Sequence, residues 1–168
     1  MIVSSILSAI GCGLLSTLEP DSGHPKWIGY QALTGIGIGL GMQQPLIAVQ
    51  TVLDITDVPV GTSIIIFIQT LGGALFVSIA QSVFTNKLVD GLAQYAPSVD
   101  PSIILRTGAT SIQSTVEKAV LPGVTLAYSE ALTKSFLVAA IMAAFTIIGS
   151  CAIEWKSVKG KKIEMGAA

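Results

Sequence analysis

Four long stretches of this chain carry no charged side chain, and they restrict the possible fold more than any other feature. No Asp, Glu, Lys or Arg occurs in residues 1–18, 27–53, 58–86 or 135–153. Only 11% of the residues are charged, against about 25% in a typical soluble domain. About 20 apolar residues of helix cross a bilayer core of about 30 Å. The sequence therefore predicts an all-α membrane protein with four transmembrane helices, at about 1–18, 27–53, 61–84 and 135–153.

The first predicted helix is short and begins at the first residue. A helix over residues 1–18 spans about 27 Å, barely the thickness of the hydrocarbon core. No basic residue precedes this apolar run and no small-residue cleavage site follows it, which argues against a signal peptide. We therefore expect a piece of a longer protein, although small proteins that begin inside the membrane also exist.

Basic residues predict the orientation of the chain. The segment 154–168, which follows the last predicted helix, contains four lysines close to the helix end. Lys and Arg near helix ends mark the cytoplasmic side. With four crossings, both termini are then cytoplasmic, and residues 85–134 lie outside. Within that outer segment, Ile112, Val116 and Val120 recur at helical spacing and predict a short amphipathic helix on the outer membrane surface.

The stretch TGIGIGLGMQQP, residues 34–45, places glycines at alternate positions. The dinucleotide-binding fingerprint needs glycines at i, i+2 and i+5, and this spacing does not match it. On a helix the same residues form two overlapping GxxxG faces, Gly35 with Gly39 and Gly37 with Gly41. Small residues let membrane helices approach closely, so these glycines predict helix packing.

The other predicted helices carry small residues at the same fourfold spacing. In chain order these residues are Ser5, Ala9, Gly13 and Thr17, then Thr70, Ala74, Ser78 and Ser82, then Ser135, Ala139 and Ala143. We therefore expect all four helices to pack closely against other helices.

The second predicted helix contains a proline, and glutamines occur in this helix and the next. Pro45 predicts a bend, because proline removes one helical hydrogen bond. Uncharged amides occur in this helix and the next, at Gln43, Gln44, Gln50, Gln69 and Gln81. An amide at membrane depth must bond to another helix or face a watery cavity. Both interpretations stay open for Gln43 and Gln50, whereas a bond to another helix is favoured for Gln81. The candidate substrate-pathway residues are Gln43, Gln44, Gln50 and Gln69.

Asp57, in TDVPVGTS, directly precedes the third predicted helix. An aspartate at this position is typical of a helix N-cap, with Pro59 in the first turn. A gating contact is the alternative function for this carboxylate.

The remaining reactive residue types form no recognisable site. Cys12 and Cys151 fall in different predicted helices and are interpreted as packing residues. His24 has no partners at metal-ligand spacing. We therefore expect no metal, no cofactor and no catalytic constellation, and the near-neutral charge without a basic patch argues against nucleic acid as a partner.

Longer segments of the chain resemble a known family. The segments YQALTGIGIGLGMQQPLIAVQTVL, DITDVPVGTSIIIFIQTLGGALFVSIAQSVFTNKL, GATSIQ and AYSEALTKSFLVAA occur here in order. They resemble the C-terminal end of fungal major facilitator efflux pumps, in particular the fourteen-helix drug:proton antiporters. No one of these segments is a strict signature, but the series covers nearly the whole chain.

The resemblance implies a function and a set of partners. It implies that the chain is the last four helices of such a pump, with the second helix facing the central cavity. The whole pump would export small organic molecules or toxins by proton-coupled antiport from the plasma membrane, or across the vacuolar membrane. Its partners would be membrane lipid, the missing N-terminal helices and a small-molecule substrate. The family's antiporter helix and charged coupling positions are absent here, and the alternative is a small four-helix assembly or regulatory subunit without transport activity.

Overall fold

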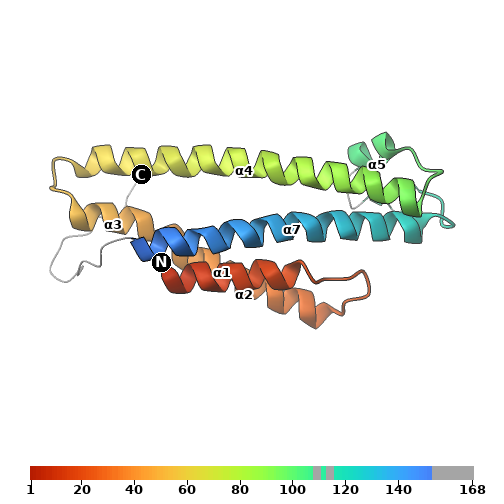
Figure 1. The fold of residues 1–168 in the computed structure, drawn as a ribbon, viewed down its shortest axis with the longest axis horizontal. Coiled ribbons are helices and arrows are strands. Elements are labelled where there is room, and N and C mark those ends of the chain that lie inside the picture. Colours follow the sequence, from red (N-terminus) through yellow and green to blue (C-terminus); the bar gives the residue numbers. More distant parts are fainter. Residues whose placement is uncertain (108–110, 113–115, 153–168) are drawn as a thin grey trace.

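The computed structural model describes residues 1–107, 111–112 and 116–152, and every regular element in these ranges is a helix (Figure 1). The helices are α1 (Ile2–Leu15), α2 (His24–Met42), α3 (Gln44–Val52), α4 (Val58–Tyr95), α5 (Pro101–Thr107) and α7 (Leu121–Ala152). Helix α1 packs against α2 and α7, and α4 packs against α7 and, at its start, against α3. The all-α prediction is therefore confirmed. The predicted tail, residues 154–168, lies outside the described residues.

Among the described residues, three segments are long and apolar enough to cross a membrane, namely His24–Val52, Val58–Tyr95 and Leu121–Ala152. Helix α1 has 14 residues, which corresponds to about 21 Å and is shorter than predicted. It ends because hydroxyls just beyond it bond back to its last carbonyls. Ser16 Oγ donates to the Gly13 carbonyl at 2.6 Å, and Thr17 Oγ1 donates to the Leu14 carbonyl at 2.7 Å.

Helices α4 and α7 are much longer than the spans predicted at 61–84 and 135–153. Their 38 and 32 residues correspond to about 57 Å and 48 Å, well beyond a hydrocarbon core of about 30 Å. The segment 85–134, expected to be mainly a loop, is therefore largely helical. Residues 124–135 are part of α7 and continue as helix into the last predicted span.

The ends of α4 and α7 that extend beyond the charge-free stretches enclose a hydrophobic core, which we call the cap cluster. It consists of Leu88, Leu92, Ala96, Ile104, Ile112, Val124, Ala127 and Ala131. Its contacts explain why the two helices continue past their predicted ends. Ile112, which was predicted to lie on an amphipathic surface helix, is instead buried in this cluster. Val120 directly precedes α7. Residues 113–115 lie outside the described residues.

Helix α5 completes the cap cluster through Ile104 and begins with a side-chain cap. The Ser102 backbone N–H donates to Asp100 Oδ1 at 2.8 Å, and the Ile103 N–H donates to the Asp100 carbonyl at 3.1 Å. The first of these bonds lowers the pKa of the exposed Asp100 carboxyl below its usual value. Asp100 and Pro101 therefore fix where α5 starts over the end of α4.

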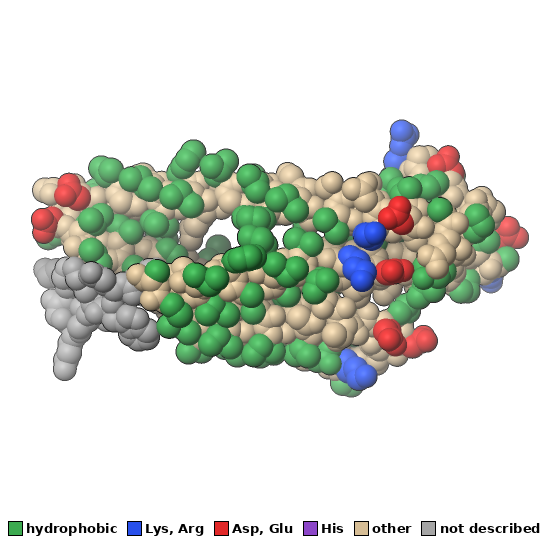
Figure 2. Space-filling model, in the orientation of Figure 1, with side chains coloured by type: hydrophobic (Ala, Val, Ile, Leu, Met, Phe, Trp, Pro, Cys, Tyr) green, Lys and Arg blue, Asp and Glu red, His purple; other side chains and the backbone are tan. Residues whose placement is uncertain are grey.

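Charged side chains gather at the cap end of the molecule, and a long, mostly uncharged surface separates them from acidic side chains at the opposite end (Figure 2). None of the residues in the most apolar windows of α4 and α7 is buried within the chain. Large side chains such as Phe67, Leu71, Phe145 and Ile148 are mostly exposed. This surface must therefore face lipid or further helices.

Candidate functional site

One of the two glycine faces of α2 packs directly against α1. A Cβ atom on Gly37 would lie 2.6 Å from the backbone nitrogen of Ser8, and one on Gly41 would overlap the hydroxyl of Ser4. Gly37 is buried. The close approach that the sequence predicted is therefore present for this pair, because only glycine leaves room for the α1 backbone.

The second glycine face is open. No atom of the described residues lies within 4 Å of a Cβ position on Gly35 or Gly39. Both residues are exposed along α2. The packing predicted for this pair has no counterpart within the chain, so a contact of this face with another helix stays a prediction.

The small-residue face predicted for the first helix is not the one that meets α2. Gly11 faces α2, where a Cβ atom would lie 2.8 Å from Thr34 Cα, whereas nothing lies within 4 Å of Gly13 among the described residues. Ser5 points toward α7 instead, and its hydroxyl lies 3.3 Å from that of Ser150. The contact with α2 is therefore displaced around α1 from the predicted face.

The small residues predicted to pack on α4 have no packing partner within the described chain, so their contact with another helix stays a prediction. Ala74 and Ser78 are both exposed. Helix α7 contacts the opposite side of α4, where Ser135 Oγ donates to the Ala80 carbonyl at 3.5 Å. Nearer the cap, a Cβ atom on Gly91 would lie 3.0 Å from Ala127 Cβ. Gly91 therefore lies in a close contact between α4 and α7, which was not predicted because Gly91 lies outside the charge-free stretch 58–86.

The bend predicted at Pro45 is present as a complete break between α2 and α3. Helix α2 ends at Met42, Gln43 forms a turn, and α3 starts with Pro45 in its first turn. Pro45 has no N–H and cannot donate to the carbonyl of Gly41. The Gln43 backbone N–H donates to that carbonyl instead.

Gln69 reaches this break from the neighbouring helix. Its Nε2 donates to the Met42 carbonyl at 3.4 Å, a long and therefore weak hydrogen bond between α4 and the end of α2. This is the helix-to-helix bond that was one of the two interpretations of the glutamines. A contact of Gln69 with a substrate stays a prediction.

The other candidate glutamines surround the break without forming one cluster. Gln43 is exposed, and Gln44 and Gln50 are half-buried. Gln50 lies about 10 Å further along the chain direction than Gln43, because each helical residue advances about 1.5 Å. The site thus offers neutral amides at and beyond the end of α2, suited to hydrogen bonding and not to acid–base chemistry.

The connection from α3 to α4 holds the break in place. A Cβ atom on Gly61 would lie 2.7 Å from Val49 Cγ1 and 2.5 Å from Leu53 Cδ1, so α3 packs tightly on the start of α4. Asp57 occupies the predicted N-cap position, and its carbonyl accepts the Gly61 N–H at 3.0 Å. Its carboxylate makes no capping hydrogen bond, contrary to the expectation.

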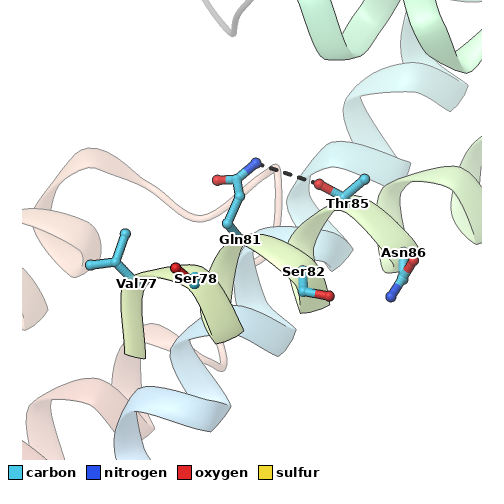
Figure 3. A pocket seen from close by; sticks show the side chains of 6 residues that line it. All are labelled: Val77, Ser78, Gln81, Ser82, Thr85 and Asn86. Atoms are coloured by element: carbon cyan, nitrogen blue, oxygen red, sulfur yellow. Dashed lines mark hydrogen bonds between the residues drawn. The ribbon is translucent and has the colours of Figure 1, made fainter. Parts of the chain in front are cut away.

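A second polar surface lies on α4, closer to the cap (Figure 3). It is a shallow open groove of about 490 Å³, lined by Val77, Ser78, Gln81, Ser82, Thr85 and Asn86. Gln81 Nε2 donates to Thr85 Oγ1 at 3.4 Å. The polar residues of this groove are three and four positions apart in the sequence, a spacing that places them on one side of a helix. From the sequence, however, Ser78, Gln81 and Ser82 are interpreted as packing residues. No group of three or more His, Cys, Asp or Glu side chains suited to a metal occurs in the described part of the chain.

Comparison with known proteins gives a consistent family. The chain is 53% identical over 166 residues to the MFS-type efflux pump MFS1 of Trichophyton rubrum. The matched region covers 99% of this chain and 31% of that pump. The chain is homologous to fungal MFS-type efflux pumps. The MFS-type transporter astH of Aspergillus oryzae is 47% identical over 97% of the chain, and the Aspyridones efflux protein of Neocamarosporium betae is 48% identical over 98% of it. No protein-family model and no solved structure matches.

These relatives are named as transporters. Their names describe transporters and efflux proteins and not enzymes. The chain spans about 30% of the length of the relatives it matches. The segments α2–α3, α4 and α7 are the candidate membrane spans in the described part of the chain, consistent with a partial MFS fold.

Proposed function

We propose that this chain forms part of the substrate pathway of an MFS-type pump that exports small organic molecules. The observation that carries the proposal is the 53% identity, over 99% of the chain, to a protein named an efflux pump. Relatives named for the efflux of aspyridones and acetylaranotin support organic compounds as the substrate class. The broken helix, with the neutral amides of Gln43, Gln44 and Gln50 at and beyond the end of α2, suits the recognition of such molecules without a fixed charge.

The proposed partners are the remaining helices of the pump, together with lipid. Facilitator transport moves two halves of a protein around a site near the middle of the membrane. The apolar windows of α4 and α7 have no buried residue within this chain, which leaves surface for further helices. We therefore propose that export requires those helices.

The proposed coupling is proton antiport, with the proton-carrying residue outside this chain. A proton relay in a membrane needs Asp, Glu or His. Residues 27–53, 58–86 and 135–153 contain none of these. The glutamines at the break can bind a molecule but cannot carry the proton.

We propose the plasma membrane as the site of the pump, with both termini cytoplasmic and the cap outside. In this proposal the short helix α1 is a fourth crossing beside the three longer segments. Four crossings require both ends of the chain on one side, and Ser5 of α1 and Ser150 of α7 are neighbours at one end of the molecule. In a background without native cysteines, an impermeant thiol reagent on intact cells should modify Ser98→Cys and leave Ser157→Cys unmodified. If the reagent modified only the cysteine at position 157, the orientation would be the opposite of the one proposed.

The pathway residues are tested by Gln43→Ala and Gln50→Ala in the complete polypeptide. Each loss of an amide contact should cost about 1 kcal/mol, which corresponds to about a fivefold change in affinity. We expect export to fall several-fold for some substrates and to stay unchanged for others. Gln94→Ala, an exposed glutamine near the cap, is the matched control and should leave export of every substrate intact. Equal losses for all substrates that follow protein abundance would assign both glutamines to structure.

A further inference from the structure

We propose that the membrane surface on the cap side crosses the molecule at the level of Lys26 and Lys134, where these two lysines contact the phosphate headgroups of the lipid. Beyond this level the cap cluster stands in water. The partner is thus the headgroup layer itself. Neither the export function nor the side of the cell that the cap faces enters the proposal.

The burial of apolar side chains changes along α4 and α7. No residue in the most apolar window of either helix is buried within the chain. In the cap cluster, by contrast, Leu88 and Leu92 are completely buried, and the neighbouring charged residues Lys87, Asp90 and Glu130 are exposed. Apolar side chains inside and charges outside are the pattern of a protein core in water, whereas an apolar exterior suits lipid. The boundary between lipid and water must therefore lie between the two parts.

The contact between α4 and α7 gives the position of this boundary. Ser135 Oγ donates to the Ala80 carbonyl at 3.5 Å, and Lys134 is the residue next to this contact on the cap side. From Val58 to Ala80, α4 runs about 33 Å, and from Ser135 to Ala152, α7 runs about 26 Å, in both cases without a charged residue. Both lengths are close to a hydrocarbon core of about 30 Å, which the complete helices exceed.

Lys26 reaches the same level on α2. Gly37 of α2 lies against Ser8 of α1, and Ser5 of α1 lies beside Ser150 of α7. Lys26 precedes Gly37 by 11 residues. The lysine of α7 precedes Ser150 by 16 residues, of which the step from Ser5 to Ser8 takes up three, leaving 13. The two lysines are thus two residues apart in height, which is about 3 Å.

The side chains at this level suit a headgroup layer. Lys26 and Lys134 are exposed, and neither forms an ion pair with a residue that the structure describes. A lysine can keep its apolar stem along the hydrocarbon and extend its ammonium group to the polar layer. Trp27 is 38% exposed, and its Nε1 donates to His24 Nδ1 at 3.3 Å. Tryptophan is enriched at membrane–water interfaces, where its ring faces lipid and its N–H a polar group.

The first experiment measures depth in the membrane. Nitroxide spin labels are attached to single cysteines in the complete polypeptide, in a background without native cysteines and in phosphatidylcholine vesicles. Leu75→Cys and Val89→Cys are matched, because both side chains are exposed and they lie within about 40° of each other around α4. Oxygen, which concentrates in lipid, should relax the first label more than a water-soluble nickel chelate does. The chelate should dominate at Val89→Cys, and Gln81→Cys, at the level of the boundary, should give an intermediate ratio.

Three results would overturn the boundary. Relaxation of the Val89→Cys label mainly by oxygen would place the cap in lipid. Relaxation of the Leu75→Cys label mainly by the chelate would place the middle of α4 in water. A ratio at Gln81→Cys equal to that at Leu75→Cys would move the surface toward the cap, away from the two lysines.

The second experiment tests the contact with phosphate. Lys26→Gln and Lys134→Gln are combined, and Lys87→Gln is the matched control, because Lys87 lies beyond the boundary and pairs with Asp90 at 3.2 Å. We expect phosphatidylglycerol to raise the melting temperature of the same polypeptide in detergent above that in phosphatidylcholine. The double variant should lose about half of this rise or more, because lysines near the surface attract anionic lipid. The control should keep it; an unchanged rise in the double variant would show that these lysines do not bind headgroups.

Discussion

Replacing Gly37 by leucine should separate α2 from α1. A Cβ atom at this position already falls 2.6 Å from the Ser8 backbone nitrogen, so the larger side chain forces a backbone to move. Overpacking of this kind costs about 1–3 kcal/mol or more. We expect a lower melting temperature for the purified protein in detergent, together with loss of cross-linking between cysteines placed at Ser4 and Gly41.

Gly39→Leu is the matched control, two residues away on the same helix. Nothing in the described chain lies within 4 Å of its Cβ position, so the isolated chain should keep its melting temperature and the cross-link. An equal loss of stability for both variants would mean that helix propensity, and not the contact with α1, explains the effect.

The second large effect is expected in the cap cluster. Leu92 is completely buried there among residues of α4, α5 and α7. Leucine-to-alanine changes in packed cores cost about 2–5 kcal/mol. Leu92→Ala should therefore lower the thermal stability and expose the connection between α4 and α7 to protease.

Leu75→Ala, on the same helix, removes the same atoms from a side chain that is 52% exposed. It should change the stability of the isolated chain much less, because few protein contacts are lost. If the two variants had the same effect, the buried core of the cap would not contribute to the stability of the protein.

The sequence predicted the helices because charge-free stretches of this length have few alternatives in a protein. It also located the break, since Pro45 cannot continue the hydrogen bonding of α2. It could not choose between the two glycine faces. Periodicity defines which residues share a face, but only the neighbouring helix decides that Gly37 is covered and Gly39 is open.

The cap was missed for a different physical reason. Leu88 and Leu92 alternate with charged and polar residues, so the segment has the composition of a solvated loop. Their burial depends on Ile104 and Val124, which arrive from distant parts of the chain. The groove on α4 was missed because serine serves equally well as a small packing residue and as a hydrogen-bonding one.

Helix α4 is a single unbroken helix that connects two distant parts of the molecule. It runs without interruption from its contact with α3 to the cap, over about 57 Å. A tilt of about 10° around the end that carries Gly61 would move the end at Tyr95 by about 10 Å. A shift of α3 against Gly61 would therefore be carried along the unbroken helix to the end at which the cap cluster lies.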